Sequence, residues 1–145
     1  MRYLARKHGL APKTEQEIQL SDQTESLCYE ISRNCYAVCY NHVTYEKSKS
    51  DFIENTSKKL TYLNNLLSDR DFITGTRLTY VDIYCFDLFL LLKTFEPSLI
   101  ENNHNLINFI DRINKLPNIK EYFESGRHKV KKYCAPFAKC FLSYR

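Results

Sequence analysis

The chain has 145 residues, of which 43% are hydrophobic and 26% charged, and its formal net charge is +4 at neutral pH. This length suits one compact domain, and the mixture is that of a globular protein rather than a disordered one. No apolar run approaches the roughly 18 residues needed to cross a membrane, and the N-terminus lacks the apolar centre of a secretory signal. We therefore expect a cytoplasmic protein with no membrane partner. The modest charge gives no reason to expect a nucleic-acid partner.

Helix breakers are rare, with three Gly and four Pro, so we predict an all-α fold. Residues 3–10 are typical of the last turns of a helix, because basic residues precede Gly9. The next helices are expected, in chain order, at 14–41, 50–67, 79–94, 106–113 and 119–124, the last one starting from Pro117. This pattern predicts an up-and-down bundle of about five helices with 79–94 at its centre.

The helix expected at 14–41 carries two rows of side chains. An apolar stripe at helical spacing predicts its buried face. Tyr29, Arg33, Tyr36 and Tyr40 form a second row at i, i+4, i+7 and i+11. Aromatic rows of this kind more often pack against a neighbouring helix than line a binding site, and periodicity alone leaves both interpretations open.

The stretch RLTYVDIY places Asp82 just before the very apolar run CFDLFLLLKTF. Thr79 and Asp82 have the spacing of a capping box, in which each side chain bonds the backbone N–H of the other residue. A helix start that is buried leaves four N–H groups without helical partners, and the carboxylate also faces the positive end of the helix dipole. We therefore interpret Asp82 as a structural cap rather than a general acid.

Cys35, Cys39 and His42 share one helix face and could hold a metal ion together with a fourth ligand. No paired CxxC occurs, however, and buried, reduced cysteines explain the pattern better. We therefore expect no metal.

The segment 127–140 mixes cations and aromatics, as single-strand nucleic-acid binders do. It is short, and a solvated helix end followed by a packed extension is the simpler interpretation.

Several motifs together resemble the mu class of glutathione transferases. The segment from Gly75 to Asp82 resembles the capping-box segment of that family's C-terminal domain, and RYLARKHGL at 2–10 resembles the end of the last helix of its first domain. The stretches at 39–41 (CYN), 94–99 (TFEPSL) and 105–127, with the basic tail, follow in mu-class order. The resemblance implies a remnant of a thioredoxin-like domain at 1–10 and the all-α C-terminal domain at 11–145.

The resemblance also implies roles for individual residues. In the family, the thioredoxin-like domain binds glutathione and supplies the tyrosine that activates its thiol, so we expect no catalytic residue for that step here. Tyr40 matches a tyrosine of the electrophile site, and Tyr29, Arg33 and Tyr36 match positions that shape the same pocket. Glu30 stands where the family has an aspartate that contacts glutathione held by the other subunit.

Two functions are therefore expected, and the sequence leaves both open. One is a mu-like transferase that joins glutathione to hydrophobic electrophiles, with this chain supplying the electrophile-binding domain and inactive alone. Glutathione is then a co-substrate, no other cofactor is needed, and a homodimer is expected if the first domain is present. The alternative is a non-catalytic helical binding module derived from such an enzyme.

Overall fold

The computed structural model describes residues 1–127, 133–135 and 137–140, and the account below concerns those residues. Within them α-helices joined by turns and loops make up the regular structure, and the one β contact is an isolated bridge between Phe72 and Gly75. The all-α prediction is confirmed. The helices are α1 (Arg2–Lys7), α2 (Glu15–Cys39), α3 (Tyr45–Leu66), α4 (Tyr80–Phe95), α5 (Ser98–Glu101), α6 (His104–Asn114) and α7 (Pro117–Glu124).

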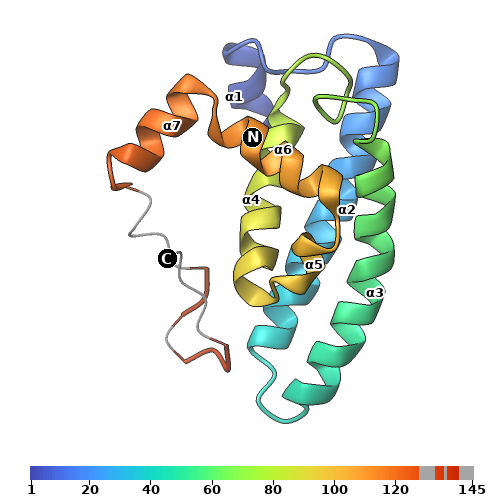
Figure 1. Cartoon of the computed structure of the whole chain (residues 1–145), viewed down its shortest axis with the longest axis vertical. Helices are drawn as coiled ribbons and strands as arrows, with labels where there is room; N and C mark the ends of the chain where they lie inside the picture. The colour runs from blue at the N-terminus through green and yellow to red at the C-terminus, as the bar shows by residue number, and fades with distance from the viewer. Residues whose placement is uncertain (128–132, 136, 141–145) are drawn as a thin grey trace.

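The two longest helices, α2 and α3, form a hairpin, and α4 packs against α2 (Figure 1). α5 and α6 cover α4 and α3, whereas α7 extends away from the hairpin and contacts α6. α4 is apolar on most of its surface, and its side chains from Phe86 to Phe95 are largely buried. Edge-to-face ring pairs join it to its neighbours, with Phe89 against Phe109 and Phe95 against Phe52. The expected central position of this helix matches the structure.

Helix starts and ends follow local chemistry. Thr14 accepts from the N–H of Glu17, whose carboxylate bonds the N–H of Thr14 in return, so α2 starts with a capping box. Gly9 has φ +73° just after α1, and Gly126 has φ +72° just after α7. These are the left-handed C′ positions at which glycine costs least.

Two elements differ from the sequence-based expectation. α3 begins at Tyr45 rather than Ser50, because the side chain of Asn41 accepts from the N–H of Thr44 and donates to the hydroxyl of Ser48, which organises a polar first turn. An apolar pattern does not reveal such a turn. The four-residue α5 was not predicted at all, since it is shorter than the window over which helical periodicity can be recognised.

Candidate functional site

Asp82 lies fully buried at the start of α4 and accepts from three groups. Its Oδ1 accepts from the N–H of Ile73 at 2.7 Å, and its Oδ2 accepts from the N–H of Thr79 at 2.7 Å and from the Thr79 hydroxyl at 2.9 Å. The two residues form the reciprocal capping box. Burial raises the pKa of Asp82, and the three donors act in the opposite direction. All three donors belong to the chain itself, so this carboxylate holds the backbone in place at the start of α4.

Three of the four residues in the predicted row meet in one cavity. Tyr29, Arg33 and Tyr36 project from α2 into a space of about 410 Å³ against α4. Tyr84 and Asp87 of α4 complete the polar part of its wall. Sequence analysis did not identify these last two. With Leu88 and Leu91 they form an i, i+3, i+4, i+7 row on α4, and that spacing was the available signal.

The cavity is rich in hydrogen-bond donors. Burial raises the pKa of Tyr36 to about 12, with the charge of Asp87 as the next cause, so this phenol is a neutral donor at physiological pH. Tyr29 is 60% exposed, and its ring is therefore open to a ligand. The side chain of Arg33 is exposed and makes no hydrogen bond or ion pair with any residue that the structure describes. Its guanidinium is always charged.

Tyr40, one turn beyond Tyr36, does not line this cavity. Its oxygen accepts from the N–H of Ala135 at 3.0 Å, and its ring lies against Phe137 with the centroids 5.7 Å apart. Beside it, the N–H of Lys139 donates to the last helical carbonyl of α2, that of Cys39, at 2.7 Å. Ala135, Phe137 and Lys139 therefore lie against this end of α2. As an acceptor from Ala135, Tyr40 keeps its own O–H available to donate.

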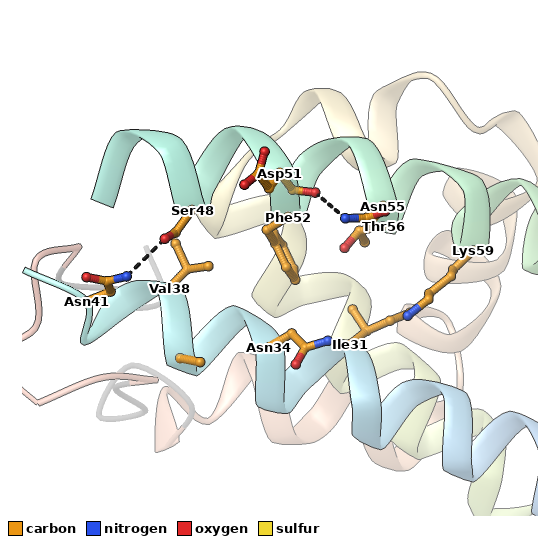
Figure 2. Close-up of a pocket in the computed structure, with 11 residues that line it drawn as sticks. Ile31, Asn34, Val38, Asn41, Ser48, Asp51, Phe52, Asn55, Thr56 and Lys59 are labelled. Atoms are coloured by element: carbon orange, nitrogen blue, oxygen red, sulfur yellow. Dashed lines mark hydrogen bonds between the residues drawn. The ribbon is translucent and has the colours of Figure 1, made fainter. Parts of the chain in front are cut away.

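Glu30 lies on a different side of α2, where its carboxylate pairs with Lys59 of α3. Lys59 is one of eleven residues around a groove of about 340 Å³ between α2 and α3 (Figure 2). Polar groups of this groove bond one another, as when Asn41 donates to the hydroxyl of Ser48 and Asn55 to the carbonyl of Asp51. These bonds engage the side chains of Asn41, Ser48 and Asn55 within the groove itself.

A second hollow of about 420 Å³ lies between α4 and α7. Its lining is mainly apolar, with Phe86, Leu90 and Phe123 among the residues that form it. It shares Tyr84 and Asp87 with the cavity between α2 and α4, so the two spaces adjoin along α4. Together they form a site with a polar, aromatic end between α2 and α4 and an apolar end between α4 and α7.

The remaining sequence candidates bring no further site together. Among the described residues, no group of three His, Cys, Asp or Glu side chains is arranged to hold a metal ion. Cys35 and Cys39 are buried, and a hydrogen bond with Cys35, followed by burial, raises the pKa of Cys39 well above its usual value. Most of the basic run 127–132 lies outside the described residues. No described helix has the length and apolar character that crossing a membrane requires.

Comparisons with known proteins agree with this architecture. The profile of the family described as "Glutathione S-transferase, C-terminal domain" matches residues 29–126. Glutathione S-transferase B of Cavia porcellus is 32% identical over 138 residues, which is 95% of this chain and 63% of that protein. Glutathione S-transferase Mu 1 of Rattus norvegicus is 33% identical over 128 residues, 88% of this chain and 58% of that protein. The chain thus spans about three-fifths of the length of these relatives.

Solved structures show the same fold. The glutathione S-transferase Blo t 8 superposes with a TM-score of 0.87 over 96% of this chain and 66% of its own, at 24% identity. The Pi-class glutathione S-transferase of Onchocerca volvulus gives 0.73 over 86% of this chain and 61% of its own, also at 24% identity. The fold is that of the C-terminal helical domain of glutathione S-transferases. The chain belongs to the glutathione S-transferase family, of which it carries the C-terminal domain.

Proposed function

We propose that this chain supplies the electrophile-binding domain of a mu-like glutathione transferase. The observation that supports this is the joint cavity along α4, into which Tyr29, Arg33 and Tyr36 project from α2. Relatives that carry the mu name match 86% of the chain or more. On this proposal glutathione is the co-substrate, and the whole protein is a cytoplasmic homodimer that detoxifies hydrophobic electrophiles.

The reaction would be attack of glutathione thiolate on an electrophilic carbon, with expulsion of a leaving group or formation of an enolate. A thiol with a pKa near 8.5 needs a group that favours its thiolate form. The cavity offers phenols instead, and that of Tyr36, with a pKa near 12, is a hydrogen-bond donor rather than a base. The described part of the chain therefore serves the electrophile, and thiol activation belongs to a thioredoxin-like domain.

Two residues have narrower proposed roles. Tyr40 lies outside the cavity between α2 and α4, so its proposed role concerns electrophiles large enough to extend past Tyr36. It would donate its phenolic proton to an oxygen of such an electrophile, since its own oxygen already accepts from the N–H of Ala135 and is polarised by that bond. Glu30 contacts the amino group of glutathione held by a second subunit. Because the carboxylate already pairs with Lys59, this contact requires that the ammonium of glutathione share or displace that of Lys59.

A second candidate is a non-catalytic binding module. The apolar hollow between α4 and α7 favours it, since a space of about 420 Å³ can bury a small apolar ligand without any thiol chemistry. On this alternative the chain binds hydrophobic molecules and does not turn them over.

The test compares the 145-residue chain with a fusion in which a mu-class first domain precedes it. Both are passed over immobilised glutathione and assayed with a chloronitrobenzene. The isolated chain should flow through without turnover, whereas the fusion should be retained and active. A folded fusion that binds glutathione but conjugates nothing would refute the transferase proposal, and dye binding by the isolated chain would then support the binding module.

Tyr40 is tested in the same fusion. Tyr40→Phe should reduce turnover of large electrophiles and leave glutathione affinity almost unchanged, while Tyr62→Phe, on the exposed surface of α3, should change neither. A large loss of glutathione affinity in Tyr40→Phe would contradict the assignment of Tyr40 to the electrophile site.

A further inference from the structure

Most arginines in the described part of the chain pair with a carboxylate, but Arg33 does not. The paired ones are Arg2, Arg70, Arg77 and Arg112, whose nitrogens lie 2.7, 3.5, 2.8 and 3.4 Å from a carboxylate oxygen in that order. Arg33 pairs with none among the described residues, although it borders a cavity of about 410 Å³. A guanidinium that is always charged and lacks an internal partner there is available to an anion from outside.

The groups around Arg33 are aromatic. Tyr29, Tyr36 and Tyr84 line the same cavity from two helices, so a flat ring that enters it meets phenol rings on both α2 and α4. Stacked or edge-to-face ring contacts contribute beyond the apolar area that they bury. Arg6, which is also exposed and unpaired among the described residues, lies beside a hollow with only one tyrosine, Tyr80. Of these two arginines, Arg33 is the one that lies among several aromatic rings.

The arrangement of the two adjoining spaces sets the direction of binding. The cavity shares the wall formed by Tyr84 and Asp87 with the apolar hollow between α4 and α7. Arg33 attracts an anion on the α2 side of this wall, and the apolar lining lies on the other side. An anionic ligand would therefore place its charged group at Arg33 and its apolar body toward the hollow that Phe86 and Phe123 line.

We propose that the second substrate of this site is an aromatic electrophile that carries a carboxylate, and that Arg33 binds this carboxylate and determines the preference. This inference rests on the proposed function, because it names the class of electrophile for the same site. The carboxylate takes no part in the bond changes. The sulfur of the glutathione thiolate forms a bond to a ring carbon, and the leaving group on that carbon, such as chloride, departs with its electron pair.

The experiment uses two probes with the same ring and nearly the same size, the anion 4-chloro-3-nitrobenzoate and its neutral amide, 4-chloro-3-nitrobenzamide. Their dissociation constants for the 145-residue chain are measured by equilibrium dialysis at low ionic strength, without glutathione. We expect the benzoate to bind about tenfold more tightly, the effect of one charge-assisted contact at a partly exposed site. Added salt should reduce this ratio.

Arg33→Gln removes the charge, and Arg6→Gln is the matched control on α1. Arg33→Gln should bring the two dissociation constants together by weakening only the benzoate, and Arg6→Gln should leave the ratio unchanged. Equal affinities in the parent chain, or a preference that survives in Arg33→Gln, would overturn the inference. Both arginines are exposed, so the variants should fold, and far-UV circular dichroism checks that they do.

The two proposals fail in different ways. If the fusion with a first domain conjugates the benzamide but the chain shows no benzoate preference, the choice of substrate class is wrong and the transferase assignment stands. If the chain prefers the benzoate through Arg33 but the fusion conjugates neither probe, the transferase assignment is wrong and the anion selectivity stands.

Discussion

Replacing Asp82 by alanine is the most direct test of how the start of α4 is held. The substitution leaves the buried N–H groups of Ile73 and Thr79 without their acceptor. Each such group costs about 1–3 kcal/mol, and relief from burying a carboxylate offsets part of the sum. We expect a loss of about 3 kcal/mol in the free energy of unfolding. That corresponds to a shift of roughly 1.5 M in the urea midpoint and about 10 °C in Tm.

The assay is urea unfolding followed by circular dichroism at 222 nm, with Asp111→Ala as control. Asp111 is exposed on α6, so the same change there should cost less than about 0.5 kcal/mol. Asp82→Asn should recover only a minority of the loss, because its amide NH₂ faces donors where the carboxylate accepts. If Asp82→Ala unfolds at the same urea concentration as Asp111→Ala, the account of this helix start is wrong.

Three shorter predictions follow from other contacts. The pKa of Tyr36 is raised to about 12, so its contribution to stability is fully present below about pH 10 and is lost as the pH rises through 12. Between pH 9 and 12, the free energy of unfolding measured in urea should therefore fall less in Tyr36→Phe than in the parent chain. Arg77→Met removes a 2.8 Å ion pair with Glu17 and should cost about 1 kcal/mol, less at high salt, in the same assay. Tyr40→Phe removes the acceptor of the Ala135 N–H, so hydrogen exchange at that amide should become about fivefold faster with little change in overall stability.

Much of the fold could be predicted because its helix ends depend on neighbours in sequence. A capping box joins residues three apart, as at Thr14 and Thr79, and a glycine such as Gly9 acts at its own position, so short windows contain the whole signal. The start of α3 was placed too late since its organising residue, Asn41, precedes a turn with no apolar pattern. The domain boundary near residue 10 stays a prediction.

The site was harder to predict, for two physical reasons. Helical spacing correctly groups Tyr29 with its neighbours on α2, but it places Tyr40 in the same row, and only the distant segment around Ala135 explains why that side chain lies apart from the cavity. Tyr84 could not be predicted as a site residue because α4 is apolar on nearly every side. No contrast between polar and apolar faces therefore indicates which side of α4 lies against α2.

The hydrogen bond from the N–H of Lys139 to the carbonyl of Cys39 has consequences for the order of folding and for the effect of proteolysis. Its donor is synthesised long after α2, as is Ala135, which lies 95 residues beyond Tyr40. The helices can therefore assemble on a growing polypeptide while the C-terminal end of α2 still faces water. A protease that removes the chain from residue 133 onward would uncover Tyr40 and also remove Cys134 and Ala138 from the core, so clipping would expose this end of α2 and lower stability together.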